Sequence, residues 1–169
     1  MKFTKYNFNA KEIDLSKVKE RAKKEAEKIF KNPKTARGRT LSKIIEDCMW
    51  GQCPEIWLML QGYHDDIRDY HDLVDPKGRP IEVKATENLP YGKDGMTGID
   101  FVKRRYAEKM QQGWGDCATR MYIFTYVKST LEYTFEGIYD WDKQTKDFIR
   151  SDPKLITANC DLQTTITSV

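Results

Sequence analysis

The chain has 169 residues, of which 39% are hydrophobic and 33% charged, and its formal net charge is +3. This length and composition predict one domain over residues 1–169 that buries a hydrophobic core. No apolar run approaches the roughly 20 residues of a membrane span, and Met1 to Lys5 lacks the apolar stretch of a signal peptide. We therefore expect a cytoplasmic protein with no membrane partner.

The charges are unevenly distributed along the chain. Basic residues outnumber acidic ones from Lys2 to Lys43, whereas the stretch from Glu46 to Asp75 is acidic. A basic flank suits the binding of phosphates, and an acidic centre suits the binding of a metal ion. For any single lysine the alternative is a solvated helix face.

The cysteines are too widely spaced for a recognisable disulfide framework, so we expect free thiols. A zinc site built from two of them and the two histidines is the alternative, but the spacing matches no common zinc finger. The four are Cys48, Cys53, Cys117 and Cys160.

The N-terminal part predicts a basic helical region over about residues 1–40. After an arm or edge segment at 1–14, Asp14 or Ser16 caps a helix that ends near Asn32 and Pro33. Apolar residues recur at helical spacing, and lysines cover the other faces. The apolar positions are Val18, Ala22, Ala26 and Ile29. Residues 32–39 predict a basic loop.

A second helix is predicted to begin near Thr40 or Ser42. Gly51 weakens it and Pro54 favours a first turn, so we expect a break and a new helix over 54–61 that Gly62 closes. Glu55 then lies in the first turn of a helix. The helix dipole favours a carboxylate there even without a catalytic role.

Residues 72–84 predict a β-hairpin. Asp72-Leu-Val ends one extended run, the sequence Asp75-Pro-Lys-Gly has turn chemistry, and Ile81 resumes the alternation of faces. Because side chains alternate along a strand, Glu82 and Lys84 lie on one side of it. We expect Asp72 to join them, which brings two carboxylates and an ammonium to one edge of the sheet. Asp75 is expected to be a turn residue rather than a ligand.

The remaining chain predicts a long loop up to residue 98, a helix over 99–112 capped by Asp100, strands over 120–127 and 131–141, a short helix around 143–150 and a polar tail. This pattern alone indicates an α/β or α+β domain. The pairs His64-Asp65 and His71-Asp72 also occur in metal-dependent HD phosphohydrolases. Those enzymes, however, place such ligands on the helices of an all-helical domain.

The pattern of Asp72, nine intervening residues, Glu82, one residue and Lys84 resembles that of the PD-(D/E)XK nuclease superfamily. His71 stands where many members have proline. The gap is similar to those of a small phage junction-resolving endonuclease and of restriction enzymes. The stretch from Gly51 to Gly62, with Glu55, resembles the first helix of the family. The resemblance implies a restriction endonuclease-like fold: a central mixed sheet flanked by helices, with strand 121–127 parallel to strand 81–84.

The resemblance also implies a metal-dependent endonuclease for double-stranded or branched DNA. Asp72, Glu82 and the backbone carbonyl of Val83 would hold Mg²⁺, for which Mn²⁺ would substitute. Glu55 would complete a second or outer position, with Glu46 as the alternative acid. Lys84 would stay protonated and orient the attacking water.

Because one such site cuts one strand, we expect a homodimer. The candidate DNA contacts are Lys34, Arg37, Arg39, Lys77, Arg79, Lys93, Lys103 and Arg104, whose alternative role is solubility. The competing function is a catalytically inactive DNA-binding or partner-binding protein with the same fold.

Overall fold

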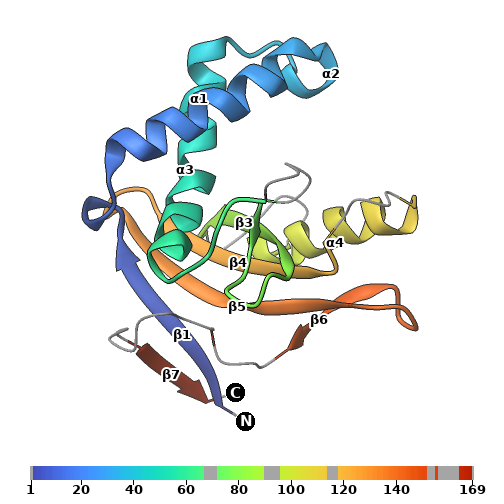
Figure 1. Cartoon of the computed structure of the whole chain (residues 1–169). Coiled ribbons are helices and arrows are strands. Elements are labelled where there is room, and N and C mark those ends of the chain that lie inside the picture. The colour runs from blue at the N-terminus through green and yellow to red at the C-terminus, as the bar shows by residue number, and fades with distance from the viewer. Residues whose placement is uncertain are drawn as a thin grey trace.

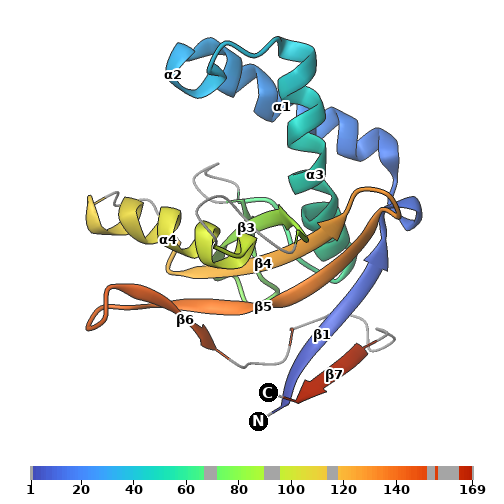
Figure 2. The ribbon, with the colours of Figure 1, turned by 180° about the vertical axis from the view of Figure 1, so that it is seen from behind.

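A computed structural model of the chain describes residues 2–66, 72–89, 96–113, 118–151, 155 and 164–168. In this part of the chain the strands form a curled mixed sheet with helices on both faces (Figures 1 and 2). His71, Lys93, Cys117 and Cys160 lie outside the described residues. No described helix has the length and apolar character needed to cross a membrane.

The strand order in the sheet is β2-β3-β4-β5-β1-β7, and β6 pairs with β5. The strands are β1 (Lys2–Asn9), β2 (Leu73–Val74), β3 (Pro80–Glu87), β4 (Arg120–Val127), β5 (Glu132–Asp142), β6 (Asp147–Ser151) and β7 (Thr164–Ser168). β3 and β4 are parallel, with Glu82 beside Met121, and the other pairs are antiparallel. The predicted parallel pairing is confirmed.

Each face of the sheet has its own core. The helices are α1 (Leu15–Lys31), α2 (Pro33–Ala36), α3 (Leu41–Leu60) and α4 (Gly98–Gln111), and Ala10–Glu12 forms a 3-10 turn. On one face, Trp57 of α3 packs against Tyr122 and Phe124. On the other, Tyr106 of α4 packs with Met121 and Ile123 (Figure 2). α1, α2 and the first half of α3 extend beyond the sheet, where a small third core joins them (Figure 1).

The predicted break in the second helix is wrong, because α3 is continuous through Pro54. A proline inside a helix has no N–H to donate to the carbonyl four residues earlier, here that of Trp50. The Tyr133 hydroxyl donates to that carbonyl at 2.7 Å instead. A side chain from β5 thus satisfies the backbone group that Pro54 leaves without a helical partner.

The predicted helix around 143–150 is also wrong. Residues 143–146 form a turn in which Asp142 accepts a hydrogen bond from the backbone of Gln144, and Lys146 has a positive φ of 54°. β6 follows, because Phe148 is fully buried between the rings of Tyr106 and Trp141. The aromatic packing of one strand residue therefore prevails over local helix propensity.

The other predicted boundaries were partly right. Asp14 caps α1 as expected. The expected basic loop contains α2, which Asn32 caps, and β3 continues to Glu87 where a loop was predicted. The cap of α4 is Thr97 rather than Asp100, and the two side chains form a capping pair at 2.8 Å. The N-terminal arm and the polar tail are β1 and β7, which pair with each other.

Candidate functional site

The predicted hairpin is formed by β2 and β3, with Leu73 opposite Ile81. Ile81 and Val83 are buried in the core beneath α3, so Glu82 and Lys84 point to the α4 face. Asp72 lies just before β2, and its Oδ2 accepts a hydrogen bond from the backbone N–H of Val83 at 2.8 Å. This bond ties Asp72 to the residue between Glu82 and Lys84, so the three predicted groups converge.

Glu82 and Lys84 form an ion pair, with Nζ and Oε1 3.1 Å apart. Tyr106 of α4 donates a hydrogen bond to Glu82 Oε2 at 3.3 Å, and its ring lies 5.7 Å from Lys84 Nζ. Tyr106 was not predicted to belong to the site. Its helical spacing indicated a buried face, but nothing distinguished it from an ordinary core aromatic residue.

Glu55 reaches the same region from α3. It is only 6% exposed and accepts hydrogen bonds from Arg21 Nη2 at 2.9 Å and from Gln52 Nε2 at 3.1 Å. Arg21 also donates hydrogen bonds to Gln52 at 2.8 Å and to Asp65 at 2.6 Å. These bonds connect α1 to α3 and to the segment that follows it. Arg21 and Gln52 were missed. The only signal for Arg21 was an arginine within a run of lysines.

Glu46, the alternative third acid, lies away from this group. Its side chain is 68% exposed and is 3.7 Å from Lys43 Nζ at the solvent-facing start of α3. The acid that α3 contributes is therefore Glu55.

Burial and neighbouring carboxylates raise the pKa values of Asp72 and Glu55. Burial raises the pKa of Asp72 well above its usual range, and the charges of Glu82 and Glu55 raise it further, against the opposing effects of Lys84 and the Val83 N–H. Burial raises the pKa of Glu55 from 4.5 to about 7, although Arg21 opposes this shift. Burial would lower the pKa of Lys84, but Glu82 and Asp72 outweigh it and the pKa is raised. Lys84 is therefore an ammonium at neutral pH.

Glu55, Asp72 and Glu82 border a cleft of about 810 Å³ beneath α1. Its floor is acidic and includes Glu55, Asp65, Asp66, Asp72 and Glu82. One wall is the side of α1 that carries Arg21, Lys24, Lys28 and Lys31, with Glu25 and Glu27 at its margin. The cleft therefore joins clustered carboxylates to a row of cationic side chains.

We tested whether the donor set fits a divalent cation. Among the described residues no three His, Cys, Asp or Glu side chains are placed to hold a metal ion. Glu82 is paired with Lys84, and Glu55 with Arg21. The chemistry of the set does fit, because crowded carboxylates are oxygen ligands whose repulsion a divalent cation relieves. Val83 turns its N–H, and hence its carbonyl, to the edge where Asp72 lies. Ligation requires rotation of the Glu82 or Glu55 side chain.

The predicted DNA contacts that the structure describes do not line the cleft. Arg39 pairs with Asp47 at 3.0 Å and also bonds backbone carbonyls of α2. Lys103 and Arg104 lie over the rings of Tyr139 and Phe101 on the sheet and α4. The others are exposed, on α2 or on turns: Lys34, Arg37, Lys77 and Arg79.

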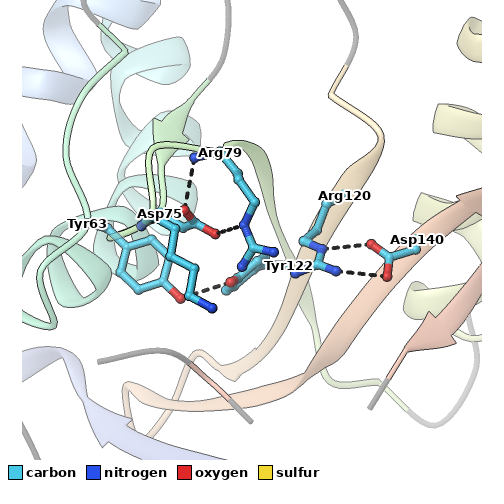
Figure 3. Close-up of polar contacts among 7 residues, drawn as sticks. Tyr63, Asp75, Arg79, Arg120, Tyr122 and Asp140 are labelled. Carbon is cyan, nitrogen blue, oxygen red and sulfur yellow. Dashed lines mark hydrogen bonds and ion pairs between the residues drawn. The ribbon is translucent and has the colours of Figure 1, made fainter. Parts of the chain in front are cut away.

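Asp75 has the predicted turn role. Its buried carboxylate accepts hydrogen bonds from the backbone of Lys77 and Arg79, both at 2.9 Å, and from Arg79 Nε at 2.7 Å (Figure 3). Cys48 and Cys53 are free thiols. His64 lies in a β-bridge with Val74, and the mixed sheet differs from the all-helical domain of HD phosphohydrolases.

Comparison with protein-family models, with curated proteins and with solved structures finds no match for the chain. The function therefore has to be inferred from the site itself.

Proposed function

We propose that the chain is a cytoplasmic, Mg²⁺-dependent DNA endonuclease of the PD-(D/E)XK type, acting on double-stranded or branched DNA. One observation carries the proposal: Asp72, Glu82 and Lys84 meet at one edge of the sheet. Asp72 bonds the Val83 N–H at 2.8 Å, and Glu82 and Lys84 are 3.1 Å apart on either side of Val83. The sequence pattern is thus also a cluster in space.

The order of elements supports the same proposal. An acidic helix, a hairpin, a crossover helix and a parallel strand follow one another as α3, β2, β3, α4 and β4. This succession agrees with the restriction endonuclease-like fold that the resemblance implies. The crossover through α4 connects adjacent parallel strands, which is the usual function of such a helix.

The proposed chemistry divides among residues that line the cleft and residues that contact Asp72 and Glu82. Asp72, Glu82 and the Val83 carbonyl would hold Mg²⁺, and the bound ion would supply Lewis-acid chemistry that polarises a phosphate and lowers the pKa of a water. Lys84 orients the attacking water and offsets negative charge that builds on the phosphate oxygens. Tyr106 fixes the side chain of Glu82, while Arg21 and Gln52 fix that of Glu55.

A catalytically inactive DNA-binding protein is the second candidate. It is favoured by the observation that, in the described part of the chain, no three ligands are arranged for a metal. In that case the Glu82 to Lys84 ion pair is a permanent structural contact. The cleft would then bind DNA without hydrolysing it.

Cleavage of plasmid and branched DNA in Mg²⁺ or Mn²⁺ separates these candidates. We expect metal-dependent nicking that Glu82→Gln and Lys84→Met each abolish. The matched controls are Glu87→Gln and Lys128→Met. These residues form another ion pair, between the end of β3 and the residue after β4, with Nζ and Oε1 3.5 Å apart, and neither lines the cleft. Full activity in the controls excludes a general effect of removing a strand charge. Wild-type inactivity in both metals would favour the inactive DNA-binding protein instead.

We also propose a homodimer, because one site of this kind hydrolyses one strand and a double-strand cut needs two. Sedimentation with and without duplex DNA measures the assembly state directly. A monomer that only nicks its substrate would contradict the dimer and leave the chemistry of the site intact.

A further inference from the structure

The wall of the cleft formed by α1 has a regular pattern of charge. Arg21, Lys24, Lys28 and Lys31 are three, four and three residues apart, which places them on one face of the helix. The neighbouring face of α1 carries Val18, Ala22 and Ala26, which are fully buried. The apolar face therefore fixes how α1 is rotated, and this rotation presents the four cationic groups, named here the cationic stripe, to the cleft.

The stripe begins at the candidate catalytic groups and leads away from them. Arg21 is bonded to Glu55 at 2.9 Å, whereas Lys31 is the last residue of α1. At 1.5 Å per residue the stripe is about 15 Å long. This length corresponds to roughly four phosphates of one B-form strand, which rises about 3.4 Å per nucleotide.

We infer that the cationic stripe of α1 is a phosphate-binding wall that holds one strand of the DNA substrate along the helix, from the candidate catalytic groups at Arg21 toward Lys31. The inference rests on the proposed function in taking DNA as the substrate. It assigns affinity to four residues of the basic N-terminal flank, none of which was among the candidate DNA contacts named from the sequence. The basic positions predicted on turns and on α4 are outside the cleft.

The charge balance of the cleft indicates where the strand lies. Seven carboxylates line it against four cationic groups. A polyanion is repelled by the acidic floor, so it binds against the stripe while a divalent cation neutralises the floor. A regular row of cations on a straight helix matches the regular phosphates of a nucleic acid better than the irregular charges of an acidic protein.

The other exposed lysines of α1 provide a matched control. Lys17, Lys19 and Lys23 are on the same helix and do not line the cleft. We compare Lys24→Gln/Lys28→Gln/Lys31→Gln with Lys17→Gln/Lys19→Gln/Lys23→Gln, both in a Lys84→Met background that prevents cleavage. Each triple variant removes three positive charges from exposed positions, so net charge and folding are matched. Thermal unfolding verifies the folding of both.

Binding of a labelled duplex in Mg²⁺ is measured over a range of salt concentrations. We expect the cleft variant to bind about 10- to 100-fold more weakly, and the slope of log K against log salt to fall by about 3, because three fewer phosphates are neutralised by the protein. The control variant should keep the slope and stay within about threefold in affinity.

Three results would overturn the inference: equal reductions in both variants, no DNA binding by the parent protein, or competition by polyglutamate as effective as that by unlabelled DNA. Failure of the nuclease proposal is seen separately in the cleavage assay. If the two triple variants differ in DNA binding as expected but the unmodified protein never cuts DNA, the phosphate-binding role of the cationic stripe is upheld and the nuclease proposal is refuted.

Discussion

Two aspartates three residues apart, Asp72 and Asp75, lie at either end of β2 and have opposite surroundings. Asp75 is 1% exposed, and three donors satisfy its carboxylate (Figure 3). Among the described residues, Asp72 has a single hydrogen bond, from the Val83 N–H, and it faces other carboxylates that raise its pKa. A buried carboxylate with all its hydrogen bonds satisfied is typical of a structural role, whereas a carboxylate crowded by like charges is typical of a functional site.

The surroundings of Asp75 extend this contrast. Tyr63 and Tyr122 share a hydrogen bond of 2.8 Å next to Asp75, and Arg120 pairs with Asp140 at 2.8 Å (Figure 3). Each of the two arginines has a carboxylate partner: the Arg79 to Asp75 pair stabilises the turn between β2 and β3, and the Arg120 to Asp140 pair joins β4 to β5. At the turn end of the hairpin, hydrogen-bond donors stabilise Asp75. At its open end, repulsion from other carboxylates destabilises ionised Asp72.

The largest expected effect is on catalysis. Asp72→Asn should reduce DNA cleavage on the order of 10³-fold, because the proposed metal site loses one of its ligands. The same variant should keep or raise the stability of the metal-free protein, because it removes repulsion from Glu82 and Glu55. Cleavage rates and urea unfolding measure the two effects. An active Asp72→Asn protein would contradict the assignment of the site.

The second effect concerns pH. The pKa of Glu55 is raised from 4.5 to about 7 in the folded protein, so the folded state holds this proton more tightly than the unfolded chain does. The contribution of Glu55 to stability is therefore fully present below about pH 4.5 and is lost as the pH rises through about 7, by on the order of 3 kcal/mol. Urea unfolding without metal at several pH values measures the decline.

Glu55→Gln should flatten this pH profile, whereas Glu46→Gln, at an exposed position of the same helix, should leave it unchanged. Added Mg²⁺ should restore stability at pH 7 if the carboxylates bind it. A profile that rises with pH between 4.5 and 7 would contradict the raised pKa of Glu55.

The hairpin could be predicted from sequence because its parts are local. Asp72, Glu82 and Lys84 lie within one turn and two strands, and the twofold period of a strand fixes their sides. Partners from distant elements could not be predicted. Arg21 is 34 residues from Glu55, and Tyr106 is 24 residues from Glu82, so only the packing of α1 and α4 brings them to the site.

The errors in secondary structure have the same cause. Pro54 indicates a helix start when only neighbouring residues are considered. Tyr133, which donates to the carbonyl that Pro54 leaves without a helical partner, is 83 residues from Trp50 along the chain. Phe148 likewise joins a strand because of rings on α4 and β5. In both places tertiary contacts prevail over local preference.

A third prediction tests the stabilised end of the hairpin. Asp75→Ala should lower the free energy of unfolding by about 2 to 3 kcal/mol, because two backbone N–H groups and Arg79 lose a buried acceptor. Asp140→Ala is the control, since its side chain is 38% exposed and a solvent-exposed ion pair contributes about 1 kcal/mol or less. Equal losses of unfolding free energy in the two variants would contradict the greater contribution expected of the buried carboxylate.

The smallest expected effect concerns the helix that delivers Glu55. Tyr133→Phe should cost about 1 kcal/mol of stability, because the Trp50 carbonyl loses its donor. In a Pro54→Ala background the new N–H at position 54 can donate to that carbonyl within the helix, so the same change should cost less. A double-mutant cycle by urea unfolding should show a coupling of about 0.5 kcal/mol or more. Additive costs would mean that the Tyr133 hydroxyl does not compensate for Pro54, and the continuity of α3 up to Glu55 would need another source.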